Sequence, residues 1–193
     1  MEKTITKENI AAYPAETFSG RIVEIRTIDE CEQAVNYLSG FEKLGFDTET
    51  RPTFTKGSIN GVSLIQLATG DTCFLFRLNI IGFPPALIQL LCNPGVVKIG
   101  LSLLDDYQSM RRRARFTPQG FIDLQNVVKN YGIEDISLQK IYALLFRKKI
   151  SKRQRLTNWE ADTLTESQKR YAALDAWACL KIYDELCLKK KSI

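Results

Sequence analysis

The chain has 193 residues, of which 45% are hydrophobic and 25% charged, and a formal net charge of +5. This length and balance predict one soluble α/β domain that buries a core. The sequence contains no histidine. Serine–histidine and cysteine–histidine catalytic pairs and histidine metal ligands are therefore excluded, and any proton chemistry must use carboxylates, tyrosine, lysine or bound water.

The sequence shows no sign of a membrane or secretory protein. No apolar run approaches the roughly 18 to 20 residues that span a bilayer. The first residues are not followed by the apolar core of a signal peptide. We therefore expect a cytoplasmic protein, or a nuclear one in a cell with a nucleus. The five cysteines are far apart and include no C-x-x-C pair, so we expect free thiols.

The predicted elements begin after an N-terminal arm. Residues 1–20 are expected to form this loosely attached arm, and residues 21–193 the single domain. Short apolar or alternating segments predict strands at residues 21–26, 44–49, 62–68, 73–78, 96–99 and 121–122. Helical periodicity and helix-start signals predict helices at residues 29–38, 84–91, 102–113, 123–130, 137–146 and 165–188.

The order of these elements predicts the fold class. Short connections between the second, third and fourth strands favour an antiparallel meander, and the later strands alternate with helices. We therefore expect an α/β fold with a mixed sheet of about five strands and helices on both faces. The last helix is predicted to start with a capping box formed by Thr165 and Gln168.

Two acids on one predicted strand are the first chemical signal. Asp47 and Glu49 are two residues apart, so they project from the same face with Cβ atoms roughly 6 to 7 Å apart. Like charges at this spacing raise each other's pKa unless a cation lies between them. A hard divalent cation such as Mg²⁺ or Mn²⁺ fits, because only oxygen ligands are available. The alternative is a solvated strand end.

A third acid lies on the apolar stripe of the last predicted helix. The residues that share this stripe are Tyr171, Leu174, Asp175, Ala178, Ile182 and Leu186. The stripe should face the core, and a buried acid is costly unless it is paired or binds a metal. Tyr171 lies one turn before Asp175 on the same side. The alternative for Asp175 is a salt bridge, or a position at a solvent-exposed end of the stripe.

A fourth acid follows the short strand at 96–99. Ser102 and Asp105 resemble a capping box, which accounts for Asp105 structurally. Asp106 is left over and can point back towards the sheet. Spacing alone does not decide between Asp105 and Asp106.

Together these residues carry a resemblance to a known family. The matching segments, in chain order, are Phe46-Asp47-Thr48-Glu49, Leu64-Ile65-Gln66-Leu67, Lys98-Ile99-Gly100 with Asp106, and Tyr171-Ala172-Ala173-Leu174-Asp175-Ala176. They resemble the DEDD superfamily of 3′-5′ exonucleases, in particular its tyrosine branch, which includes ribonuclease D and the Werner-type exonuclease domains. The similarity runs from about residue 21 to 188, and Asn158-Trp159 and Leu164-Thr165 also resemble the Werner-type members.

The resemblance implies an RNase H-like fold and a role for each matched residue. Asp47, Glu49, Asp106 and Asp175 would coordinate two divalent ions, Mg²⁺ or Mn²⁺, and the spacing from Lys98 selects Asp106 over Asp105. Tyr171 would orient the attacking water, where a sister branch uses histidine. The implied reaction is phosphodiester hydrolysis from the 3′ end with release of nucleoside monophosphates. The segments after Glu49 and Asp106 vary in the family, so substrate contacts do not transfer.

Clusters of basic residues suggest how nucleic acid would reach such a site. Arg111 and Arg112 belong to one cluster and Arg153 and Arg155 to another, and we expect these four to bind a single strand or the 3′ end of a duplex. DNA is placed slightly ahead of RNA, although no residue reports on the 2′-hydroxyl. The alternative for each cluster is a solvated face. Any helicase or repair partner would be a separate protein.

Aromatic residues and rival functions complete the sequence interpretation. Phe54 and Trp159 could stack on bases, but core packing is favoured for Trp159. One rival function is a nucleic-acid-binding module of the same fold that does not cut. A phosphatase of the haloacid dehalogenase type is another, although its Asp-x-Asp motif would require aspartate in place of Glu49. A phosphate-binding NTPase is excluded because the G-x-x-x-x-G-K-[ST] motif is missing.

Overall fold

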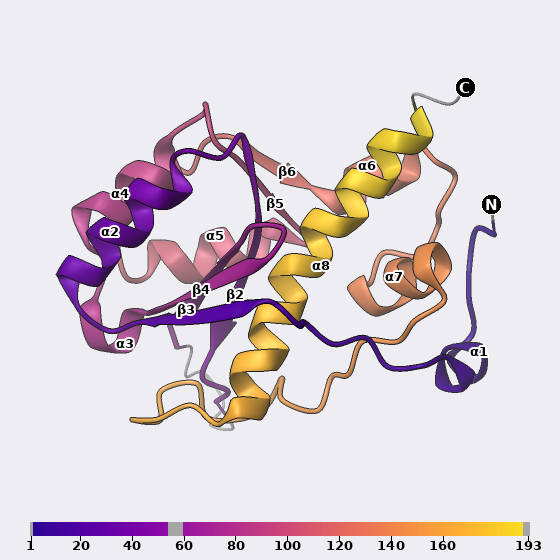
Figure 1. Cartoon of the computed structure of the whole chain (residues 1–193), viewed down its shortest axis with the longest axis horizontal. Helices are drawn as coiled ribbons and strands as arrows, with labels where there is room; N and C mark the ends of the chain where they lie inside the picture. Colours follow the sequence, from indigo (N-terminus) through magenta and orange to yellow (C-terminus); the bar gives the residue numbers. More distant parts are fainter. Residues whose placement is uncertain (1, 54–59, 191–193) are drawn as a thin grey trace.

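A mixed β-sheet forms the centre of the molecule (Figure 1). The computed structural model describes residues 2–53 and 60–190. Within them the sheet has six strands in the order β1-β4-β3-β2-β5-β6, one at each predicted segment and close to the expected number of about five. The strands are β1 Arg21–Ile25, β2 Lys43–Thr50, β3 Val62–Ala68, β4 Thr72–Arg77, β5 Val97–Gly100 and β6 Phe121–Asp123.

The pairing of the strands confirms the predicted meander and the mixed sheet. Strands β2, β3 and β4 pair antiparallel, as their short connections favoured. Strand β1 pairs parallel with β4, β5 pairs parallel with β2, and β6 pairs parallel with β5. The helices are α1 Lys7–Ala12, α2 Ile28–Leu38, α3 Leu78–Ile81, α4 Pro85–Cys92, α5 Leu103–Arg111, α6 Leu124–Lys129, α7 Leu138–Phe146 and α8 Glu166–Lys190.

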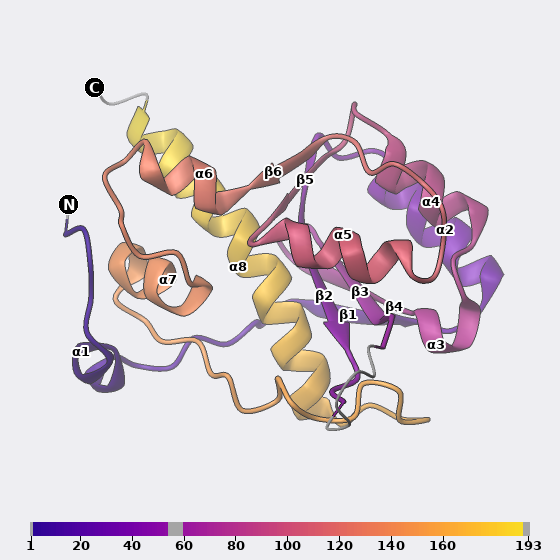
Figure 2. The same ribbon diagram turned by 180° about the vertical axis from the view of Figure 1, so that it is seen from behind.

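Helices cover both faces of the sheet, as the element order predicted (Figures 1 and 2). On one face α8 crosses the strands and packs with α6 and α7, and this side holds a large apolar cluster that includes Trp159. On the other face α2, α4 and α5 bury a second cluster that includes Phe46. The strands are therefore buried on both sides, which explains why β3 is buried along its whole length.

Helix α8 lies unusually close to β2. A Cβ atom added at Gly45 would be 2.0 Å from the carbonyl oxygen of Ala176, so only glycine allows this contact. The predicted apolar stripe of α8 is buried, including Asp175, which is 7% exposed. Residues 171–176 are in fact all buried, so the helix is enclosed on more sides than one stripe requires. The predicted capping box of Thr165 and Gln168 is also present.

The N-terminal arm is attached more firmly than expected. It contains the short helix α1, which the sequence patterns did not predict. Ile5 and Ile10 are buried against Ala143 of α7, and Phe18 is buried in the cluster beneath α8. These apolar contacts fasten both ends of the described arm to the domain.

Two expectations about composition can be compared with the structure. All five cysteines are free thiols, and three of them are buried. Among the described residues, none of the helices combines the length and apolar character needed to cross a bilayer.

Candidate active site

Three of the predicted acids meet where β2 passes beneath α8. One carboxylate oxygen from each of Asp47, Glu49 and Asp175 lies within 4.8 Å of the others. The two β2 residues share one face because strand side chains alternate, and Asp175 approaches from the buried side of α8. Residues more than 120 positions apart in the chain are thus brought to one point.

The fourth acid, Asp106, lies beside this group at the start of α5. The hydroxyl of Thr48, which lies between the two β2 acids, donates a hydrogen bond to Asp106 Oδ1. Asp106 is half-buried, whereas Asp105 is exposed. The structure therefore places Asp106, and not its neighbour, beside the acid cluster.

The predicted capping box at the start of α5 is wrong. Ser102 has a left-handed φ of 60° and its side chain makes no cap hydrogen bond. Asp123 caps this helix instead, accepting hydrogen bonds from the backbone nitrogens of Ser102 and Leu103 at 3.2 and 3.0 Å. Asp123, more than 15 residues further along the chain, thus accepts the backbone hydrogen bond at the start of the helix that local spacing had assigned to Asp105.

Burial raises the pKa of all four carboxyl groups, and repulsion by neighbouring carboxylates adds to the rise for Asp47, Glu49 and Asp106. Burial and the charges of Asp47, Asp175 and Asp106 raise the pKa of Glu49 to about 10. Burial raises the pKa of Asp175 to about 7, although the Tyr171 hydroxyl opposes the rise. The pKa values of Asp47 and Asp106 are raised well above the ordinary value, first by burial and then by a neighbouring carboxylate. Charged together, these acids need cations between them.

The donor set of this cluster suits hard divalent cations. Oδ1 of Asp175 is buried and has no hydrogen-bond partner. An orphaned carboxylate oxygen is costly unless a cation occupies its lone pairs. Oxygen-only ligands favour Mg²⁺ or Mn²⁺ over softer metals. The residues of the site therefore fit the ions that the sequence resemblance implies.

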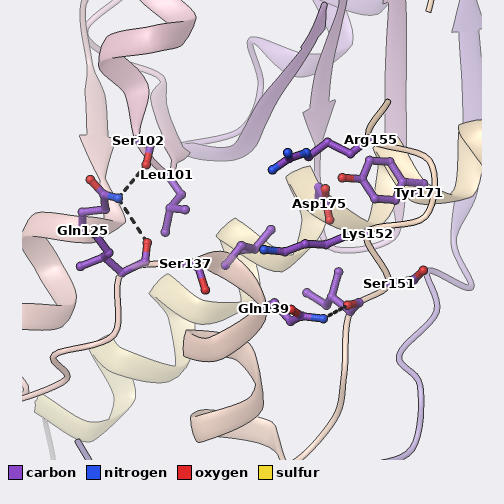
Figure 3. A pocket seen from close by; sticks show the side chains of 13 residues that line it. Leu101, Ser102, Gln125, Ser137, Gln139, Ser151, Lys152, Arg155, Tyr171 and Asp175 are labelled. Carbon is purple, nitrogen blue, oxygen red and sulfur yellow. Dashed lines mark hydrogen bonds between the residues drawn. The ribbon is translucent and has the colours of Figure 1, made fainter. Parts of the chain in front are cut away.

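The hydroxyl of Tyr171 lies near Asp175 (Figure 3). Its ring packs against Trp159, with centroids 6.0 Å apart. Burial, followed by the charges of the neighbouring carboxylates, raises the pKa of Tyr171 far above its ordinary value. The phenol therefore stays protonated at neutral pH. Trp159 is fully buried, which confirms the core-packing interpretation and excludes base stacking by this residue; Phe54 lies outside the described residues.

A cavity of about 340 Å³ opens beside Asp175 and Tyr171. Lys152 and Arg155 extend into it from the loop before α8 (Figure 3). Both cations act on the acids, because Lys152 lowers the pKa of Asp175 and Arg155 lowers that of Glu49. The polar side chains that complete the lining are Ser102, Gln125, Ser137, Gln139 and Ser151. The sequence patterns assigned none of these five residues to a site, whereas Lys152 lies next to Arg153 in the same basic cluster.

The four arginines expected to bind nucleic acid do not form one surface. Arg155 lines the cavity at the acids, and Arg153 is exposed on the same loop. Arg111 lines a separate depression with Arg115 and Phe116, beyond the far end of α5. Arg112 is exposed in that second region. The structure thus brings only Arg155 of these four to the acid cluster.

Comparison with known proteins agrees with this arrangement. Residues 22–190 match a protein family described as 3′-5′ exonuclease. The chain belongs to this family. The match spans all four acids and Tyr171, so the resemblance seen in the motifs is confirmed at the level of the family.

Individual members of the exonuclease family cover most of this chain. The bifunctional 3′-5′ exonuclease/ATP-dependent helicase WRN of Mus musculus is 31% identical over 96% of this chain and 14% of the relative. A 3′-5′ exonuclease of Arabidopsis thaliana is 29% identical over 90% of this chain and 66% of the relative. The chain therefore spans less than two thirds of the length of these two relatives.

Solved structures confirm the fold. The EXO domain of Aedes aegypti Nibbler superposes with a TM-score of 0.82 at 25% identity, covering 92% of this chain and 94% of that domain. Escherichia coli RNase D gives a TM-score of 0.77 at 24% identity over 90% of this chain and 46% of its own. The expected RNase H-like architecture is therefore confirmed.

Proposed function

We propose that this chain is a metal-dependent exonuclease that releases nucleoside monophosphates from the 3′ end of nucleic acid. The observation that carries the proposal is the convergence of Asp47, Glu49 and Asp175 within 4.8 Å, with Asp106 beside them. Membership of the 3′-5′ exonuclease family supports the direction and the class of substrate. Residues 21–193 would form the exonuclease domain, preceded by the arm of residues 1–20.

The four acids would hold two divalent cations, Mg²⁺ or Mn²⁺. When bound, these ions would offset the charge of the scissile phosphate, acidify the attacking water and stabilise the leaving 3′ oxygen. Asp175 would contribute its unpartnered Oδ1, and Thr48 would fix the orientation of Asp106. The raised pKa values of the carboxyl groups mean that metal binding would displace protons from this cluster.

Tyr171 would orient the water and would not remove its proton. Its raised pKa keeps the hydroxyl protonated, so it can donate one hydrogen bond and accept another. Trp159 holds the ring from behind, which restricts the hydroxyl to the side of Asp175. In this arrangement the general base is not tyrosine, and the chain offers no histidine for that role.

Lys152 and Arg155 would contact the phosphodiester next to the acids. Both are basic side chains that line the cavity beginning at Asp175. A phosphate held there would be drawn towards the cations of the loop and away from the carboxylates. Arg153 would add a weaker contact from the exposed side of the same loop.

The test is nucleotide release from labelled DNA and RNA of matched sequence, single- and double-stranded, with Mg²⁺ or Mn²⁺. We expect products that shorten from the 3′ end and no release in EDTA. Asp47→Asn and Asp175→Asn should abolish release, while Asp162→Asn, an exposed acid of the loop before α8, should not. Binding without release by the unaltered chain would contradict the proposal and favour the non-cutting alternative. The DNA and RNA arms decide the sugar preference.

A further inference from the structure

Glu16, in the N-terminal arm, is the centre of a half-buried polar network away from the acid cluster. Its side chain is only 8% exposed. It accepts hydrogen bonds from the Tyr142 hydroxyl at 2.6 Å and from Lys148 Nζ at 3.0 Å. Lys181 Nζ lies 3.3 Å from the same carboxylate and donates to the Tyr142 oxygen at 2.9 Å. The network thus joins the arm to α7, to the residues after it and to α8.

Lys181 connects this network to the helix that carries Asp175. Its ammonium lies over the rings of Trp177, Phe146 and Tyr142, at 4.5, 4.7 and 5.4 Å from their centroids. These contacts stabilise the cation and restrict its position. Lys181 follows Asp175 by six residues, or about 9 Å along the helix axis.

The backbone beside Glu16 pairs with the segment that leads to the cavity. Ala15 forms a parallel bridge with Lys149. The Glu16 nitrogen donates to the Lys149 oxygen, and the Lys149 nitrogen donates to the Pro14 oxygen, both at 2.9 Å. The next residue, Ile150, is buried, and its carbonyl accepts a hydrogen bond from Gln139 at 2.7 Å. Ile150 and the two residues after it, Ser151 and Lys152, line the cavity.

We infer that residues 14–16 of the arm position the loop that presents Lys152 and Arg155 to the substrate phosphate, with Glu16 as the positioning residue. The inference rests on the proposed function. Glu16 does not touch the acids or the cavity. It acts by fixing the start of the loop, because Lys148 and Lys149 are both bound to the arm and only two residues separate Lys149 from Lys152.

The test is a double-mutant cycle on a 3′-labelled oligonucleotide. Glu16→Gln keeps the size of the side chain but removes its charge. We expect kcat/KM to fall about tenfold, because small displacements of contacting groups cost about this much or more. In a chain that already carries Lys152→Met and Arg155→Met, Glu16→Gln should change kcat/KM by less than about twofold. An equal loss in both backgrounds would show a purely structural role and overturn the inference.

Two further variants keep the result interpretable. Glu134→Gln removes the exposed ion pair between Lys3 and Glu134, which fastens another part of the arm, and should leave kcat/KM unchanged. If Glu16→Gln does not fold, Lys148→Met removes one partner of the carboxylate at a more exposed site and replaces it in the cycle. Either variant is accepted only if its unfolding stays cooperative.

Hydrogen exchange separates failure of this inference from failure of the proposed function. In Glu16→Gln the amide of Lys149 and those of residues 150–156 should exchange faster, whether or not the chain cuts nucleic acid. If wild type does not cut nucleic acid but Glu16→Gln still exchanges faster than wild type, the proposed function is overturned and the anchoring of the loop by Glu16 stands. Unchanged exchange with unchanged kcat/KM in an active enzyme would overturn the inference alone.

Discussion

Replacing Asp175 by asparagine removes one charge from the buried acid cluster and leaves the side chain nearly the same size. Burial raises the pKa of Asp175 from the ordinary 3.8 to about 7. At about 1.4 kcal/mol per pH unit, this difference corresponds to about 4 kcal/mol of destabilisation when the group is ionised in the metal-free fold. The variant also weakens the interaction by which the Tyr171 hydroxyl favours the charged carboxylate, because a neutral amide oxygen is a poorer acceptor. We therefore expect a net gain of about 2 kcal/mol at pH 8.

The pH dependence gives the sign of the effect. Between about pH 4 and pH 7 the folded state keeps a proton on Asp175 that the unfolded chain has lost. The stability of the metal-free protein should therefore fall as pH rises through this window, and it should fall less in Asp175→Asn. Below about pH 4 the two proteins should differ little through this group.

Thermal unfolding in EDTA at pH 8 measures the difference. A gain of about 2 kcal/mol should raise the Tm of Asp175→Asn by about 4 to 8 °C. Asp162→Asn, at an exposed site, should stay within about 0.5 kcal/mol of wild type. Added Mn²⁺ should raise the Tm of wild type more than that of Asp175→Asn. A lower Tm of the variant in EDTA at pH 8 would refute the idea that the buried charge of Asp175 destabilises the metal-free fold.

Three other predictions follow from the packing and charges around the site. Tyr171→Phe should lower kcat by about 10²-fold and leave Mn²⁺ affinity unchanged, because in the proposed mechanism the hydroxyl orients water and does not bind the ion; calorimetry with Mn²⁺ checks the second part. Trp159→Ala should lower the free energy of unfolding by about 3 to 5 kcal/mol in urea, because the ring is fully buried against Tyr171. Glu16→Gln should lower the free energy of unfolding at neutral pH and make it depend less on pH in the acid range. Burial alone would raise the pKa of Glu16, but hydrogen bonds from Tyr142 and Lys148 lower it to about 2. The stability that the ionised carboxylate contributes is therefore present above about pH 4.5 and is lost as the pH falls towards 2.

Each of these predictions has an outcome that contradicts it. Loss of Mn²⁺ binding in Tyr171→Phe would mean that the phenol shapes the metal site itself. A cost below about 1 kcal/mol in Trp159→Ala would show that the loop before α8 packs independently of that ring. Parallel stability curves for wild type and Glu16→Gln between pH 2 and 5 would mean that the carboxylate is not held as an ion.

Periodicity in the sequence predicted the parts of the site that depend on a single element. Asp47 and Glu49 share a face because strands alternate, and Asp175 is buried because its helical stripe is apolar. Asp106 could not be separated from Asp105 by local spacing, because the decisive contact is a hydrogen bond from Thr48 on another element. The choice came from the resemblance to a family.

The errors and omissions arose where distant segments meet. The start of α5 is capped by Asp123 from β6, so the local pattern of Ser102 was misleading. Runs of basic residues marked the basic segments but not their position relative to the acids. They could not show that Arg111 and Arg155 occupy separate regions. The attachment of the arm through Glu16 depends on partners more than 120 residues away, which no local pattern reports.

The close contact between α8 and β2 has a consequence for how this enzyme family member tolerates change. Asp47 and Glu49 belong to the strand and Asp175 to the helix, so the distance between their carboxylates depends on the separation of those two backbones. That separation is set at Gly45, where any larger residue would collide with the carbonyl of Ala176. A single added methyl group at this position would push the helix away from the strand and separate Asp175 from Asp47 and Glu49. If these acids hold divalent ions as proposed, metal affinity depends on a position that contributes no ligand and no charge.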